Sequence, residues 1–162
     1  MKNIAFFFGR VLLQLAFALC AFASTWVAAQ TPQVVGRWVN GPNLPNFPIH
    51  IHLLPNSNVM FWQGDGDVNG DNPQIWNPAS GSVTALTGAG FNIFCTGHTF
   101  LPDGRLFVAG GHIQNLIGLA DASIYDPVAN TWTRQPPMNL GRWYPTNTAL
   151  PNGDVLVVSG AV

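Results

Sequence analysis

The stretch Leu101–Gly111, Leu-Pro-Asp-Gly-Arg-Leu-Phe-Val-Ala-Gly-Gly, decides the fold because the same design occurs three times. Leu54–Gly64 and Leu150–Gly160 repeat it at steps of 47 and 49 residues. Pro with Asn, Asp or Gly forms a tight turn, the β-branched and aromatic run that follows suits a strand, and the closing Gly allows the backbone to bend. A period in the forties indicates a repeat array, and strand-forming units favour a β-propeller over a helical solenoid.

A second set of markers keeps the same phase. Ile75-Trp76-Asn77-Pro78 and Ile124-Tyr125-Asp126-Pro127 lie 49 residues apart, and Val83 and Trp132 stand seven residues after the two aromatic residues. Each unit therefore reads as four short strands, which is the composition of a propeller blade.

The predicted fold class is all-β, an incomplete β-propeller of about two full blades and two partial ones. Blade one spans about residues 49–86 and blade two about residues 94–134, while a third blade begins near Tyr144 and contributes its first two strands. Residues 34–40, with Trp38 at the position of Trp132, are expected to form an outer strand that completes the last blade of a closed ring. Propellers have roughly four to eight blades, so the chain is expected to be the front portion of a longer protein.

The N-terminal segment has the layout of a secretory signal peptide. Lys2 and Arg10 precede an apolar run over residues 11–23, and small residues follow it. We expect residues 1–29 to be the signal peptide, with cleavage after Ala23 or Ala29, and residues 30–162 to be propeller. The alternative is a membrane anchor, which needs about 20 apolar residues, whereas Gln14 interrupts this run. The expected location is extracellular or periplasmic, with no membrane contact after cleavage.

Composition excludes several function classes. Apolar residues make up 48% of the chain and charged residues 8%, so the chain is not a disordered tail. Removal of residues 1–29 leaves four Arg against seven Asp, a formal charge of −3, and hence no basic stripe for nucleic acid. Removal also takes Cys20, so Cys95 becomes the only thiol of an exported protein. An odd cysteine there indicates an unusual partner or a reactive group.

Cys95 and Tyr144 each lie six residues before a Leu-Pro turn, at Leu101 and Leu150. The repeat therefore places them at equivalent positions on the innermost strands of adjacent blades. Inner strands crowd around the axis of a propeller, so the two side chains are predicted to meet. The alternative is that Cys95 is a small buried hydrophobe and Tyr144 an aromatic filler between blades.

Two motifs in this region resemble known families. Gly110-Gly111 followed by Tyr125 and Trp132 is similar to the kelch repeat signature, and Phe94-Cys95-Thr96-Gly97 with Arg142-Trp143-Tyr144 resembles the copper-radical oxidases, the family of galactose oxidase and glyoxal oxidase. The resemblance covers about residues 34–162 and implies a kelch propeller of seven blades. In this family a Cys after Phe and a Tyr one blade later form a thioether, and the modified Tyr binds copper and stores a radical.

The resemblance implies that Cys95 and Tyr144 form this cross-linked cofactor and that Tyr144 is a copper ligand. Phe94, Trp143, Arg142 and His98 are candidates for the wall of the site. The implied reaction oxidises a primary alcohol, an aldehyde or a carbohydrate with O₂ and releases H₂O₂. The family's other copper ligands, a second Tyr beside a His and a further His, lie in segments that this chain lacks, so the fragment alone is expected to be inactive.

Other candidates are weaker. His50 and His52 alternate along a strand and share a face, which suits a metal, although ordinary inner-strand residues explain them as well. His112 follows the paired glycines and could line the site. Residues 65–70 fit the start of a calcium loop, but Trp76 stands where a Glu ligand is required, and a polar turn between strands is the preferred interpretation.

Two rival functions stay open on the sequence. A non-catalytic kelch module would bind a glycan or a protein, and a structural propeller segment would belong to a cell-envelope protein. Only the oxidase requires Cys95 and Tyr144, so the fate of this pair separates the oxidase from its two rivals.

Overall fold

A computed structural model describes residue 31 and residues 35–64 and 70–162. The chain divides into two compact units, residues 1–41 and residues 42–162. The predicted signal peptide and most of the candidate calcium loop lie outside the described residues. Within the described ranges, no helix is both long and apolar enough to span a membrane.

The second unit contains two complete four-stranded antiparallel sheets, as predicted. Blade one has the strand order β1-β2-β3-β4, and blade two has the order β5-β6-β9-β10. The strands of blade one are β1 (His50–Leu53), β2 (Val59–Trp62), β3 (Gln74–Trp76) and β4 (Val83–Ala85). Those of blade two are β5 (Thr96–Phe100), β6 (Leu106–Gly110), β9 (Ala122–Asp126) and β10 (Thr131–Gln135).

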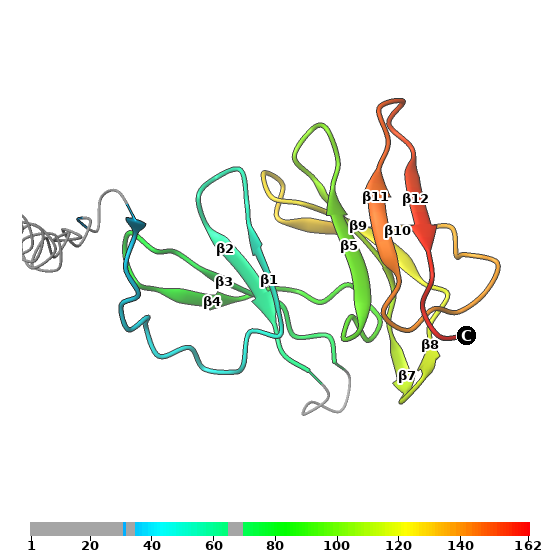
Figure 1. The fold of residues 1–162 in the computed structure, drawn as a ribbon, viewed down its shortest axis with the longest axis horizontal. Coiled ribbons are helices and arrows are strands. Elements are labelled where there is room, and N and C mark those ends of the chain that lie inside the picture. The colour runs from blue at the N-terminus through cyan, green and yellow to red at the C-terminus, as the bar shows by residue number, and fades with distance from the viewer. Residues whose placement is uncertain (1–30, 32–34, 65–69) are drawn as a thin grey trace, which may run out of the picture. The chain divides into compact units, whose positions relative to one another are not determined.

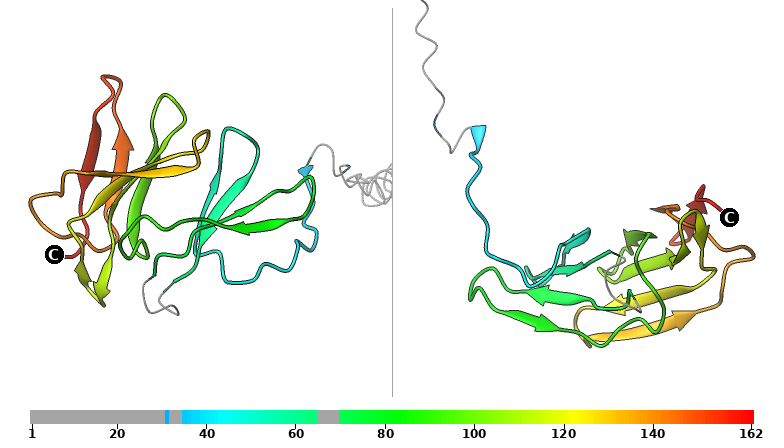
Figure 2. Two further views of the ribbon diagram at one scale, coloured as in Figure 1. Left: turned by 180° about the vertical axis from the view of Figure 1, so that it is seen from behind. Right: turned by 90° about the horizontal axis from the view of Figure 1, so that it is seen from below.

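The third blade begins with the hairpin of β11 (Thr146–Ala149) and β12 (Val155–Val158), which Figure 1 shows in orange and red beside β5. Figure 2 shows the same sheets from behind and from below. A short hairpin, β7 (His112–Gln114) and β8 (Ile117–Gly118), is inserted between the second and third strands of blade two. The repeat did not predict it, because blade one has no counterpart among its described strands.

The three Leu-Pro turns have the same hydrogen bonds, which confirms the repeat at the level of the backbone. The N–H groups of Leu54, Leu101 and Leu150 each donate, at 2.8 Å, to the carbonyl of the residue four positions later. The carbonyl of each Leu accepts from the residue three positions later, at 2.9 to 3.0 Å. The outer markers agree as well, because Trp76 pairs with Val83 and Tyr125 pairs with Trp132.

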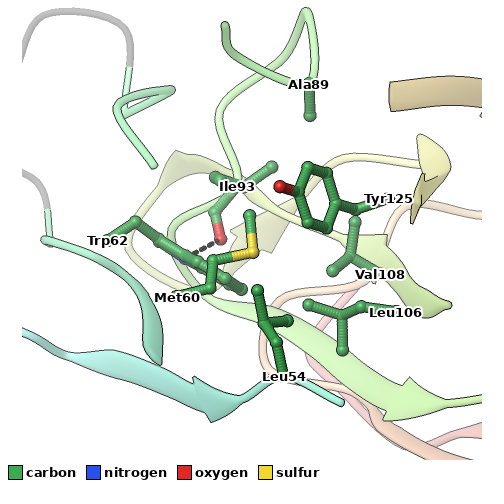
Figure 3. Packing of buried hydrophobic residues seen from close by; sticks show 8 residues of the cluster. All are labelled: Leu54, Met60, Trp62, Ala89, Ile93, Leu106, Val108 and Tyr125. Atoms are coloured by element: carbon green, nitrogen blue, oxygen red, sulfur yellow. Dashed lines mark hydrogen bonds between the residues drawn. The ribbon is translucent and has the colours of Figure 1, made fainter. Parts of the chain in front are cut away.

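The hydrophobic core lies between blades one and two (Figure 3). Blade one contributes Met60 and Trp62, blade two contributes Leu106 and Val108, and the connecting segment contributes Ile93. These five side chains are fully buried. The indole Nε1–H of Trp62 donates to the carbonyl of Ile93 at 2.9 Å, so the largest core residue also satisfies its polar atom.

Blade three approaches blade two closely because glycine stands at the contact. A Cβ on Gly97 would lie 2.6 Å from the backbone oxygen of Pro145, nearer than real Cβ contacts allow. The N–H of Arg142 donates to the carbonyl of Leu119 at 2.9 Å and the N–H of Gly111 donates to the carbonyl of Arg142 at 3.1 Å. The segment before β11 is therefore fixed against blade two.

The outer strand predicted over residues 34–40 does not form in residues 35–40, and the side chain of Trp38 is fully exposed. A single strand has no hydrogen-bonding partner unless a neighbouring strand lies beside it. The blade that residues 34–40 were predicted to complete is not formed by the described residues, which explains the difference.

Candidate functional site

Cys95 and Tyr144 occupy equivalent positions, but these lie just outside the inner strands. Cys95 immediately precedes β5, and Tyr144 stands two residues before β11. Both residues have left-handed backbones, with φ of 62° at Cys95 and 55° at Tyr144. The prediction that they lie on the strands is wrong by one or two residues, because a left-handed residue cannot continue an extended strand.

The structure brings the two residues together. The backbone N–H of Tyr144 donates to the carbonyl of Cys95 at 2.8 Å, and the two side chains are also hydrogen-bonded. Cys95 is fully buried, whereas 45% of Tyr144 is exposed. Burial raises the pKa of the Tyr144 phenol to about 12, and the Cys95 side chain adds to the shift. The phenol is therefore protonated at neutral pH.

Two of the predicted wall residues border the Tyr144 ring. Trp143 meets it edge to face at a centroid distance of 4.7 Å, and Phe94 does so at 6.1 Å. Arg142 lies two residues away, and its guanidinium donates to the carbonyl of Ser159 at 2.5 Å. The contacts of Arg142 therefore fix the segment that carries Tyr144.

His112 contacts Cys95, and the sequence did not predict this contact. Its Nδ1 lies 3.7 Å from the Cys95 Sγ and accepts the indole N–H of Trp143 at 2.9 Å. The signal that could have found it is its place directly after Gly110 and Gly111, whose positive φ values turn the chain at the end of β6. Because β6 pairs with β5, this turn lies beside Cys95.

The other three histidines cluster beside Cys95, two of them buried and His98 half-buried. His50 and His52 are buried on one face of β1, as predicted, while Ile51 and Leu53 are exposed. His98 lies against them: its Nε2 is 3.3 Å from the Nδ1 of His50, and its ring is 4.3 Å from that of His52. The predicted wall residue His98 thus contacts His50 and His52. The ring of His50 in turn lies 6.4 Å from the Tyr144 ring.

Burial lowers the pKa of all three rings. The pKa falls to about 4 at His50 and to about 3 at His52, with the neighbouring His98 as a second cause in both. The pKa of His98 is also lowered by burial, against a hydrogen bond to its own backbone. The cluster is therefore neutral at physiological pH.

The described residues do not form a metal site by themselves. No group of three or more His, Cys, Asp or Glu side chains among them is arranged to hold a metal ion. A phenolate oxygen is a suitable ligand for Cu(II), which is the role that the resemblance implies for Tyr144.

Comparison with known proteins agrees with this geometry. A model of the kelch motif matches residues 101–139. Galactose oxidase from Gibberella zeae is 27% identical over 149 residues, which cover 86% of this chain and 21% of the relative. A WSC domain-containing protein from Arthroderma benhamiae is 38% identical over 79 residues, which cover 43% of this chain and 8% of the relative.

A solved fungal alcohol oxidase of the AA5 family, in complex with copper, superposes with a TM-score of 0.63 at 24% identity, over 78% of this chain and 28% of that one. The chain thus spans less than a third of the length of these relatives. These matches confirm the all-β kelch fold and the resemblance to the copper-radical oxidases that residues 94–97 and 142–144 indicated.

Proposed function

We propose that this chain is the N-terminal part of a copper-radical oxidase that oxidises a primary alcohol or an aldehyde, carbohydrates included, with O₂ and releases H₂O₂. The contact between the Cys95 and Tyr144 side chains is the observation that carries the proposal. The similarity to galactose oxidase supports it, because the matched segment covers most of residues 30–162.

The Cys95 thiol and the Tyr144 ring are the groups that would form the cofactor. Cross-linking joins sulfur to a ring carbon, with loss of the S–H and one aromatic C–H. If O₂ takes up the two electrons and two protons, the step is R–SH + Ar–H + O₂ → R–S–Ar + H₂O₂, which balances. Bound copper would supply the one-electron redox partner that a two-electron alcohol oxidation needs in addition to the tyrosine.

The surroundings suit these roles. The Cys95 sulfur is fully buried, so competing oxidants in solution have little access to it. Tyr144 is partly exposed, so a metal and a substrate could reach this residue. The rings of Trp143 and Phe94 border the phenol and would restrict water at its edges.

Residues 1–29 are proposed to be a signal peptide and residues 30–162 the first part of the propeller, so the site would act in the extracellular or periplasmic space. Among the described residues, no group of three or more His, Cys, Asp or Glu side chains could hold a metal ion. We therefore expect residues 30–162 alone to have no oxidase activity.

Intact mass of the complete protein tests the proposal. After treatment with copper and air, the wild type should lose two hydrogen atoms, and Cys95→Ser and Tyr144→Phe should not. Denatured wild type should also resist thiol alkylation at Cys95 after this treatment. An unchanged mass together with full alkylation of Cys95 would overturn the oxidase proposal and favour a kelch module that binds a glycan or a protein.

A further inference from the structure

The backbone of Cys95 is hydrogen-bonded in both directions outside its own blade. Its N–H donates to the Nε2 of His50 in blade one at 3.2 Å, and its carbonyl accepts the N–H of Tyr144 in blade three at 2.8 Å. Cys95 also has the left-handed φ of 62° that non-glycine residues rarely adopt. A strained conformation of this kind persists only when its surroundings fix it.

The hydrogen bonds assign the proton positions in this chain of contacts. A backbone N–H can only donate, so the Nε2 of His50 is the acceptor and carries no proton. The neutral ring then carries its proton on Nδ1 and donates it to the Nε2 of His98 at 3.3 Å. His98 therefore fixes the tautomer of His50 that can accept from Cys95.

The position of His50 is fixed by a third contact. Its ring stacks on Trp62 at a centroid distance of 5.0 Å with planes 21° apart, and Trp62 is fully buried in the core. The packing of blade one thus also holds the acceptor nitrogen in place.

We propose that His50 is a positioning residue: it accepts the Cys95 N–H and so holds Cys95 in the left-handed conformation that directs its thiol to Tyr144. His98 takes part by fixing the His50 tautomer. The role in directing the thiol toward cross-linking rests on the proposed oxidase function, whereas the role in holding the Cys95 backbone does not.

Two substitutions distinguish the effect of the hydrogen-bond acceptor of His50 from the effect of its ring. His50→Phe keeps an aromatic ring on Trp62 and removes the acceptor, whereas His50→Gln removes the ring and places an amide oxygen near the position of Nε2. His52→Phe is the matched control, since His52 is a second buried imidazole against Trp62, at 4.9 Å, and lies two residues further from the Cys95 end of β1.

The first measurement is amide hydrogen exchange in the copper-free complete protein, with cysteine and valine labelled for NMR. We expect the Cys95 amide to exchange about tenfold faster in His50→Phe than in wild type, because a buried N–H then lacks its acceptor. His50→Gln should stay within about threefold of wild type. The Val108 amide in β6 reports any general loss of stability, and His52→Phe should not change the ratio of Cys95 to Val108.

If the Cys95 amide of His50→Phe exchanges at the wild-type rate, or accelerates only in step with Val108, His50 does not hold Cys95 and the proposal is wrong. If His50→Phe fails to fold, the Gln variant decides: a Cys95 to Val108 ratio as in wild type supports an acceptor role, and a tenfold rise in that ratio contradicts it.

The second measurement is the rate of loss of two hydrogens after addition of copper and air. We expect a rate about tenfold lower in His50→Phe and near wild type in His50→Gln, which a merely structural role of the ring would not produce. If the wild type never cross-links, the oxidase function is contradicted. The hydrogen-exchange result alone then decides whether His50 holds the Cys95 backbone. A cross-linking wild type with an equally fast His50→Phe would contradict the role of His50 in directing the thiol.

Discussion

Each inner hairpin has two ends, and the sequence repeat is stronger at one end than at the other. At the turn end, residues 54–58, 101–105 and 150–154, both the Leu-Pro pair and the hydrogen bonds recur in all three copies. At the cysteine end, residues 94–97 and 142–146, the backbone recurs but the side chains do not: Cys95 and Tyr144 share a left-handed φ and little else. The turn end builds the blade, and the cysteine end uses the same geometry to place two different reactive groups.

The two ends also treat backbone strain differently. Ser57, Gly104 and Gly153 are equivalent turn residues with φ of 64°, 86° and 90°, so glycine relieves the strain in two of three copies. At the cysteine end neither left-handed residue is glycine. Left-handed non-glycine residues of this kind are typical of functional sites, which is consistent with the proposed pairing of Cys95 with Tyr144.

Acid should produce the largest difference between the two ends. The native pKa values of about 4 for His50 and about 3 for His52 lie below the ordinary 6.5, so the unfolded chain takes up protons first as the pH falls below 6.5. The stability of the native state is complete above pH 6.5 and is lost progressively toward pH 3. We expect a loss on the order of 5 kcal/mol at about pH 4.

The turn end should not contribute in this range. The N–H of Arg105 lowers the pKa of Asp103 below 3.8, so the stability from this carboxylate is lost only as the pH falls below 3.8. Hydrogen exchange of β1 and β2 at pH 7 and about pH 4 measures the effect, and His52→Phe should reduce it. Equal protection at the two pH values would contradict the prediction.

Substitution of one glycine at each end should give the next largest effect. A Cβ on Gly97 would lie 2.6 Å from both the Pro145 backbone oxygen and the Asn147 Oδ1, so Gly97→Ala must push blade three away from blade two. We expect the free energy of unfolding to fall by about 3 kcal/mol. Gly153→Ala meets nothing within 4 Å and should cost about 1 kcal/mol, through its φ of 90° alone.

Gly97→Ala should also slow cross-linking of Cys95 with Tyr144, and Gly153→Ala should not. Local opening energies of β5 and β11 from native-state hydrogen exchange check the first difference, and intact mass checks the second. Equal costs at the two glycines would show that the close approach at Gly97 does not hold the two blades together.

The same contrast explains which features the sequence could predict. The four-stranded blades and their order followed from turn residues and strand formers, which act locally and recur. The pairing of Cys95 with Tyr144 followed from the repeat as well. The contact of His112 with Cys95 depends on the turn at Gly110 and Gly111, and the His50 contact depends on the left-handed φ of Cys95. The direction of that turn does not recur in the described residues of blade one, and although the φ recurs at Tyr144, no shared residue type marks it in the sequence.

Ser57→Gly should sharpen the argument about strain at the turn end. Glycine adopts the φ of 64° at position 57 without a Cβ conflict, and it already occupies the equivalent positions 104 and 153. We expect the variant to be more stable by roughly 0.5 to 1 kcal/mol. Thermal or urea unfolding of the complete protein measures this, with Ser80→Gly in the neighbouring Asn77 turn as a control for the loss of a serine. A destabilised Ser57→Gly would show that Ser57 has a role beyond the turn.

The smallest effect should be a change in the titration of Tyr144, and it tests the cysteine end directly. The measurement uses copper-free protein and subtracts the phenolate absorbance of Tyr144→Phe from that of the wild type. The difference should titrate with a pKa of about 12. Cys95→Ala removes the side-chain hydrogen bond, so the pKa should move down toward 10 and stay above it, because burial is the larger cause.

Tyr125, whose pKa is raised by burial and by the charge of Asp126, should be unaffected by Cys95→Ala. Rapid pH jumps allow the phenolate to form before the chain unfolds. A Tyr144 pKa near 10 in the wild type, or one that ignores the loss of the Cys95 thiol, would mean that sulfur and phenol are not in contact in solution. The left-handed backbones of Cys95 and Tyr144 would then have no role in pairing the two side chains. The two ends of the hairpins would differ in sequence but not in function.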